Sequence, residues 1–171
     1  MRLLAVALLA LSACLPESTD SVTLSPTTAE LEALLLAADA RWEAAGVEAD
    51  RIIIAPVGSS DGAPVRLVPE RAPTSQTVQM GQGHAFVGVR WMELDRLDLD
   101  LATHELGHAL GIGGPGHYIQ HLDADEPEAC ARPVAERPVM CAYVGAVLDE
   151  ASLGLACDTG ACTEYAPESA Q

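Results

Sequence analysis

The residues best suited to chemistry form the segment His104-Glu105-Leu106-Gly107-His108. Its two histidines are four residues apart, so on a helix they lie on one face and both imidazoles can reach one metal ion. Glu105 follows His104 directly and is poorly placed to bind the same ion. Its carboxylate can instead take a proton from a metal-activated water, as in zinc-dependent hydrolysis. The spacing therefore predicts a zinc-binding helix with Glu105 as general base; the alternative is a surface helix carrying two unrelated histidines.

Two later residues extend this motif. Gly111 stands three residues after the second histidine, where a glycine can adopt positive φ, end the helix and turn the chain back toward the metal. Met140 lies further on, within the segment Pro-Val-Met-Cys-Ala-Tyr at 138–143. With the His-Glu-x-x-His motif, these residues resemble the metzincin clan of zinc peptidases and, within it, the matrixin-like members. The resemblance implies that Met140 is the methionine of a tight turn below the metal.

The third metal ligand is where the sequence departs from the metzincin pattern. That pattern places the ligand at residue 114, which is Gly114 here. The stretch that follows is rich in Gly and Pro and turn-prone, so a short insertion can still bring His117 to the metal. We therefore predict His117 as the third ligand, with His121 as the alternative. Asp123 and Asp125 stay open as carboxylate ligands, since zinc also accepts oxygen.

The N-terminus has the pattern of an export signal. Met1 and Arg2 precede an apolar run at 3–11, which is too short to span a bilayer permanently. The run ends in Leu-Ser-Ala-Cys at 11–14, which resembles the bacterial lipobox. That resemblance implies cleavage after residue 13, acylation of Cys14 and anchoring in a bacterial membrane. Leu15 stands where an Asp would signal retention in the inner membrane, so we expect the outer membrane. An ordinary secretory signal, giving a periplasmic or extracellular protein, is the alternative.

Composition limits the partners of the exported chain. The 171 residues include 25 acidic and 9 basic ones, with a net charge of −16, which argues against nucleic-acid binding. We expect residues 1–13 to be a signal peptide and 14–26 a flexible Ser/Thr/Pro-rich tether that begins at the lipidated cysteine. Residues 27–165 would form one monomeric domain, followed by a frayed tail at 166–171.

Four cysteines remain beyond Cys14. An even number in an exported domain indicates two disulfides, and four cysteines allow three pairings. We expect the local pairing, Cys130 with Cys141 and Cys157 with Cys162. Structural zinc binding by the thiols is the alternative, but the spacings are not those of Cys-x-x-Cys pairs.

The rest of the chain alternates between helical and strand patterns. Thr27 or Thr28 can cap a helix that ends at Gly46 and buries Trp42. Strands are predicted at 51–57 and 65–68, and a hairpin or two edge segments at 77–89. The active-site helix begins at Asp98 or Asp100, a long loop spans 112–137, and a last helix covers 149–155.

The metzincin resemblance implies an α+β zincin fold. In that fold, a small twisted mixed sheet packs on the N-terminal helix and the His-Glu-x-x-His helix, and the C-terminal part is rich in loops. Residues 77–89 would supply an edge strand that binds the backbone of a peptide or protein substrate. His84 could then touch the substrate, although an ordinary strand histidine is the simpler interpretation. The implied function is a zinc-dependent endopeptidase, in which Tyr143 could assist the oxyanion. A zinc-binding but inactive surface lipoprotein is the alternative, motivated by Gly114.

Overall fold

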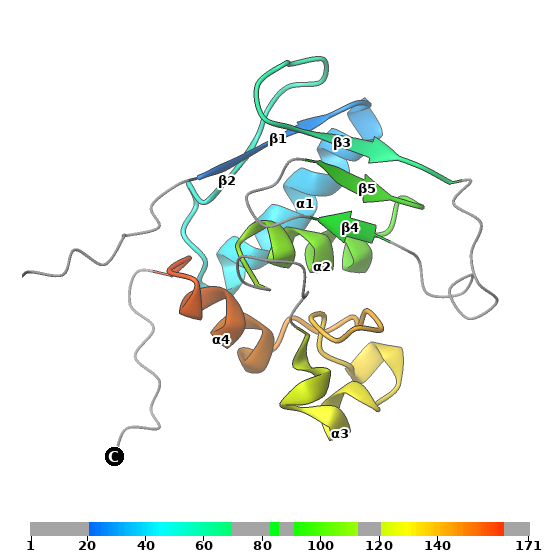
Figure 1. Ribbon diagram of the computed structural model, residues 1–171, viewed down its shortest axis with the longest axis vertical. Helices are drawn as coiled ribbons and strands as arrows, with labels where there is room; N and C mark the ends of the chain where they lie inside the picture. Colours follow the sequence, from blue (N-terminus) through cyan, green and yellow to red (C-terminus); the bar gives the residue numbers. More distant parts are fainter. Residues whose placement is uncertain (1–20, 70–82, 86–90, 113–120, 163–171) are drawn as a thin grey trace, which may run out of the picture.

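The computed structural model describes residues 21–69, 83–85, 91–112 and 121–162, and these form an α+β fold (Figure 1). The described strands are β1 (Val22–Pro26), β2 (Ile52–Ile54), β3 (Ala63–Leu67), β4 (Gly83–Ala85) and β5 (Met92–Leu94). The described α-helices are α1 (Ala29–Ala45), α2 (Leu99–Ala109), α3 (Pro127–Cys130) and α4 (Glu150–Asp158). Two short 3₁₀ helices, η1 (Leu122–Ala124) and η2 (Val134–Glu136), lie in the expected long loop.

The strands form one mixed sheet in the order β2-β1-β3-β5-β4. Four strands run parallel, and β4 pairs antiparallel with β5, with Gly83 opposite Leu94 and Ala85 opposite Met92. The mixed sheet agrees with the sequence-based expectation. Strand β4 also lies at a sheet edge, as expected for part of residues 77–89; the remainder of that segment falls outside the described residues.

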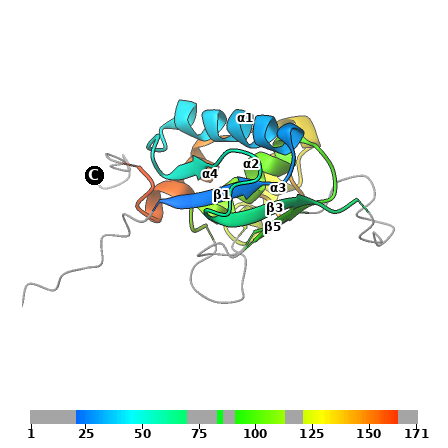
Figure 2. The same ribbon diagram turned by 90° about the horizontal axis from the view of Figure 1, so that it is seen from above.

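Helix α1 covers the first half of the sheet. The Thr28 side chain caps its N-terminus by accepting from the Leu31 amide, and Gly46 ends the helix at φ 122°. One face of α1 is fully buried, and this face includes Trp42. The helix packs on β1, β2 and β3, whereas α2 packs on β4 and β5, and the two helices also pack on each other. Both helices therefore lie on the same face of the sheet, and Figure 2 shows α1 as a layer above the strands.

The expected tether at 14–26 is wrong at its C-terminal end. Residues Val22–Pro26 form β1, which pairs with both β2 and β3 and so lies inside the sheet. Leu24 is completely buried there. The Ser, Thr and Pro content of the segment suggested a linker, but alternate apolar residues were enough for a short strand once the sheet supplied partners on both sides. The signal peptide, Cys14 and the tail at 166–171 lie outside the described residues.

Both expected disulfides are present. Cys130 is bonded to Cys141, and Cys157 to Cys162. Disulfides of this kind are typical of an oxidising, exported environment. Among the described residues, no helix combines the length and apolar character needed to cross a bilayer.

A half-buried carboxyl group on α1, that of Asp39, predicts a pH-dependent stability. Burial, together with the nearby Glu43 carboxylate, raises the pKa of Asp39 to about 6. Since the folded state binds the Asp39 proton more tightly than the unfolded chain, this group favours folding below pH 3.8, and that contribution is lost as pH rises through 6. Replacing Asp39 by Asn should therefore stabilise the protein at pH 8 by about 1 kcal/mol after allowance for solvent screening.

Thermal unfolding of the wild type and Asp39→Asn at pH 4 and pH 8 checks this expectation. The difference between the two proteins should be larger at pH 8 than at pH 4. An Asn variant that is equally or less stable at pH 8 would contradict it.

Candidate metal centre

Helix α2 carries the His-Glu-x-x-His motif in the interior of the protein. The Asp98 side chain caps the helix by accepting from the Leu101 amide, which settles the start that the sequence left open between Asp98 and Asp100. Residues 101–109 are all buried, and His104, Glu105 and His108 are each at most 3% exposed. Figure 1 shows α2 between the sheet and the segment that contains α3. The histidines are therefore not those of a solvated surface helix.

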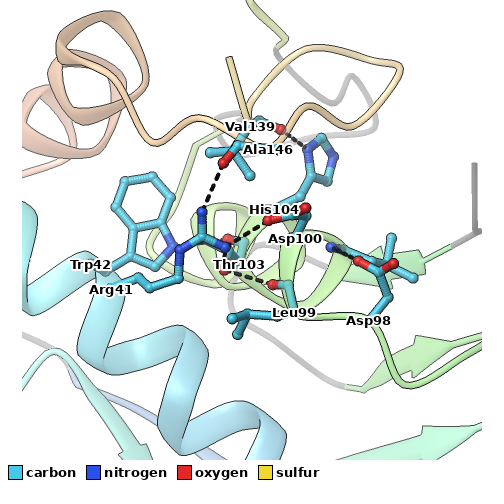
Figure 3. Close-up of polar contacts among 10 residues, drawn as sticks. Arg41, Trp42, Asp98, Leu99, Asp100, Thr103, His104, Val139 and Ala146 are labelled. Atoms are coloured by element: carbon cyan, nitrogen blue, oxygen red, sulfur yellow. Dashed lines mark hydrogen bonds and ion pairs between the residues drawn. The ribbon is translucent and has the colours of Figure 1, made fainter. Parts of the chain in front are cut away.

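Arg41 on α1 fixes the position of α2. Its guanidinium donates to the Asp100 carboxylate at 2.8 Å and to the Thr103 hydroxyl at 3.1 Å. It also donates to the Ala146 carbonyl at 3.0 Å, so one side chain joins α1, α2 and the chain before α4 (Figure 3). The neighbouring Trp42 donates its indole N–H to the Thr103 carbonyl at 2.8 Å. Two adjacent residues of α1 thus hold the turn of α2 that precedes His104.

The two motif histidines are oriented by backbone carbonyls. His104 Nδ1 lies 2.7 Å from the Val139 carbonyl oxygen (Figure 3), and His108 Nδ1 lies 2.9 Å from that of Ile112. Since a carbonyl oxygen only accepts, each Nδ1 must carry the proton, and each Nε2 of the neutral ring presents a lone pair. Gly111, at φ 103°, turns the chain so that the Ile112 carbonyl faces His108. The predicted helix end at Gly111 is confirmed.

The two Nε2 atoms face each other at 3.1 Å. Two lone pairs at this distance repel unless a positive charge lies between them. The separation is close to the ~3.4 Å expected between two nitrogen ligands of a tetrahedral zinc ion with Zn–N bonds of about 2.0–2.1 Å. A shared proton would require one imidazolium, which burial disfavours. The orientation of His104 and His108 therefore fits a metal ion.

His121 completes a cluster of three imidazoles. Its ring centroid lies 5.2 Å from those of both His104 and His108, and the ligand atoms of all three residues lie within 4.8 Å of one another. The structure thus brings the alternative third ligand, His121, to the site. His117, which the sequence analysis ranked first, lies outside the described residues. Three nitrogen donors suit a transition metal better than calcium or magnesium.

Burial favours the neutral form of all three imidazoles. Burial lowers the pKa of His104 well below its ordinary value of 6.5, and the neighbouring His108 lowers it further. Burial likewise lowers the pKa of His108 to about 4. The pKa of His121 is also lowered by burial, with the Asp123 carboxylate acting in the opposite direction. Neutral imidazole is the form that binds metal ions, so protons compete weakly for these ligands.

Met140 packs directly beneath the motif. It is completely buried in a turn in which the Cys141 amide donates to the Pro138 carbonyl at 3.3 Å. A methyl group added at Gly107, between the two histidines, would lie 2.5 Å from the Met140 sulfur and 3.0 Å from Trp42. Gly107 is thus required by this close packing. Met140 lies where a methionine below the metal ligands is expected, although its role as a Met-turn residue stays a prediction.

The remaining predicted site residues have ordinary surroundings. Tyr143 is half-exposed and its carbonyl accepts from Arg137, so its suggested part in oxyanion stabilisation stays untested. Asp125 is exposed and is absent from the histidine cluster. Asp123, considered above as a ligand, instead accepts a hydrogen bond from the Ala142 amide at 2.6 Å. The sequence analysis missed the part played by Arg41, because nothing in a sequence says which distant backbone an arginine will reach.

Comparison of the chain with protein-family models, with curated protein sequences and with solved structures found no significant match.

The packing of Gly107 predicts a reversal of the usual effect of alanine in a helix. Gly→Ala in a helix interior ordinarily stabilises by up to about 1 kcal/mol. Here the added methyl group would overlap Met140 and Trp42, so Gly107→Ala should destabilise the fold by about 1–3 kcal/mol. Chemical denaturation of the metal-free protein measures this change.

A double variant tests the assigned cause. In the background of Met140→Ala, which removes the side chain that the methyl group would meet first, Gly107→Ala should cost less than it does alone. Equal costs in both backgrounds would show that the clash with Met140 does not determine the effect.

Proposed function

We propose that this protein is a zinc-dependent endopeptidase that hydrolyses peptide bonds with Glu105 as general base. The observation that carries the proposal is the buried cluster of His104, His108 and His121, with the two Nε2 atoms of the motif 3.1 Å apart and Glu105 on the same helix. The resemblance of residues 104–111 and 138–143 to the metzincin pattern supports the same reaction.

Zinc bound by these three imidazoles would supply a Lewis acid that lowers the pKa of a water molecule and polarises a carbonyl group. The donor set fits this role, because three neutral nitrogens leave a position open for water on a four-coordinate ion. The carbonyls of Val139 and Ile112 hold His104 and His108 in the tautomer that directs Nε2 to the ion. Such partners fix the orientation of the rings and raise the basicity of the ligand nitrogens.

Glu105 would carry out the proton transfers. It is only 2% exposed, so its carboxylate acts in an environment where charge interactions are strong. It would take a proton from the attacking water and later pass it to the leaving amine, which is the ordinary sequence of general base and general acid catalysis. Burial keeps competing bulk water away from this step.

The substrate would bind along β4. No described strand pairs with the outer side of β4, so its backbone groups can add an extended peptide to the sheet. Helix α2 packs against β4, and Figure 1 shows the two elements next to each other. A peptide on this edge would therefore run beside the helix that carries Glu105. We also propose export with a lipid anchor at Cys14, on the signal-like sequence at 1–14.

A zinc-binding protein without catalytic activity is the second candidate. The same three histidines would bind the zinc ion in such a protein. The reason to consider it is that Gly114 stands where the metzincin pattern has a histidine. Catalytic turnover is the property that separates the two candidates, and Glu105 is the residue to vary.

The first prediction from this proposal concerns Glu105→Gln. The amide keeps the size of the side chain but cannot accept a proton, so cleavage of a peptide library should fall by at least about 100-fold while bound zinc stays stoichiometric. Zinc content by elemental analysis and cleavage by mass spectrometry give the two readouts on the exported, disulfide-bonded protein.

Three outcomes are distinguishable. Cleavage that persists in Glu105→Gln would overturn the assigned general base. Stoichiometric zinc with no cleavage by the wild type would favour the zinc-binding protein. A wild type that binds no zinc would remove both candidates.

The second prediction concerns the third ligand. His121→Ala should weaken zinc binding by at least about 100-fold, since it removes one of three protein ligands, whereas His117→Ala should change it little. Competition with a chromogenic chelator measures both variants. The reverse ranking would restore His117 as the ligand.

A further inference from the structure

His121 approaches the cluster from a segment that is bonded to the turn carrying Met140. The Leu122 amide donates to the Met140 carbonyl at 3.1 Å. The Asp123 carboxylate accepts from the Ala142 amide at 2.6 Å. The 3₁₀ helix η1 that starts here is three residues long, and His121, the N-cap residue that precedes it, makes no side-chain cap bond. Because so short a helix has little stability of its own, its position depends on these outside contacts.

A disulfide also links the His121 segment to the Met140 turn. Cys141 lies between the two residues that bond the His121 segment, and its partner Cys130 follows that segment at the end of α3. The Asp123 carboxylate lies within 4.8 Å of both sulfur atoms. The turn also supplies the Val139 carbonyl that orients His104. The backbone at 139–142 therefore positions two of the three imidazoles, those of His104 and His121.

We propose that Asp123 and the Cys130–Cys141 disulfide form a clamp that holds His121 in place as a metal ligand, so that metal affinity depends on both. The inference rests on the metal site of the proposed function. Asp123 is a positioning residue in this account, because it acts through His121. The clamp restricts the motion of His121 before the ion binds, so less conformational entropy is lost on binding. Preorganisation of this kind raises affinity.

Thermodynamic linkage adds a reciprocal consequence. If the disulfide raises the affinity of the histidine cluster for zinc by some factor, zinc bound at that cluster must make Cys130–Cys141 harder to reduce by the same factor, and zinc bound by the freed thiols acts in the opposite direction. Reduction by glutathione would transfer two electrons and two protons to the cysteines, giving two thiols and one glutathione disulfide. The second disulfide, Cys157–Cys162, encloses Thr159, which donates to the Leu110 carbonyl on the His108 side of the cluster, and it therefore provides a control for the His121 segment.

Substitution of Asp123 tests the hydrogen bond apart from the charge. Asn keeps an oxygen acceptor for the Ala142 amide, whereas Ala removes it. Zinc alone is the probe, and chelator competition on the full chain gives its dissociation constant. We expect Asp123→Ala to weaken zinc binding by about tenfold and Asp123→Asn by less, in line with the effect of residues that orient metal ligands.

The same pair of variants in a His121→Ala background shows whether Asp123 acts through His121. With the third ligand gone, Asp123→Ala and Asp123→Asn should bind zinc alike. A difference that persists in this background would overturn the role of Asp123 as a positioning residue, because a general loss of structure would affect both backgrounds equally.

Removal of each disulfide tests the covalent part of the clamp. Ala is used in place of Cys, since free thiols beside Asp123 would themselves bind zinc. Cys130→Ala with Cys141→Ala should weaken zinc binding by about tenfold or more. Cys157→Ala with Cys162→Ala should change it by less than about twofold, and thermal unfolding without metal compares the damage to the fold.

A comparison of the wild type with His121→Ala separates protection by the metal site from zinc that the freed thiols bind. In glutathione buffers, followed by alkylation and mass spectrometry, zinc should make Cys130–Cys141 harder to reduce in the wild type than in His121→Ala, and leave the reduction of Cys157–Cys162 alike in both. Equal zinc affinities in both disulfide variants, or the same zinc effect on Cys130–Cys141 in the wild type and in His121→Ala, would overturn the clamp while the proposed function stands. Absence of zinc binding by the wild type would instead overturn the metal site itself.

Discussion

The arrangement of the interior depends on two buried imidazole nitrogens that face each other with no proton to share. His104 and His108 each commit Nδ1 to a backbone carbonyl, which leaves both Nε2 lone pairs directed at one point, 3.1 Å apart. That arrangement is unfavourable in an apolar interior unless a cation lies at the shared point. The fold nevertheless provides the carbonyls, the helix spacing and a third imidazole, His121, around the same place. These features together suit the binding of a metal ion.

Contacts from other parts of the structure hold the helix of this site, α2, in position. The α1 residues Arg41 and Trp42 bond the first half of α2, and Arg41 also reaches the chain at Ala146. On the other side, the turn containing Met140 presses against Gly107 and presents the Val139 carbonyl to His104. Helix α2 is therefore held from two directions by segments distant in sequence. A site built on such a supported helix can keep ligand positions fixed more accurately than one built on loops.

Local sequence signals predicted the features that depend on local interactions. At each helix start the sequence offered two candidates, and Thr28 and Asp98 are the caps. The helix ends at Gly46 and Gly111 and both expected disulfides are also present. The features that were missed depend on partners far along the chain. Strand β1 exists because β2 and β3 flank it, and β5 (Met92–Leu94), which was not predicted, is a three-residue strand between two others.

The third ligand shows the same limit at the level of the site. His117 and His121 both follow a Gly- and Pro-rich stretch, and spacing alone favoured the nearer residue. What brings His121 to the cluster is the pairing of its segment with the Met140 turn, through hydrogen bonds that spacing does not reveal and through the predicted Cys130–Cys141 disulfide. Burying three imidazoles and a carboxylate opposes folding of the metal-free chain, and metal binding would offset that cost. In such a protein the affinity for the ion and the stability of the fold are two measures of one set of contacts.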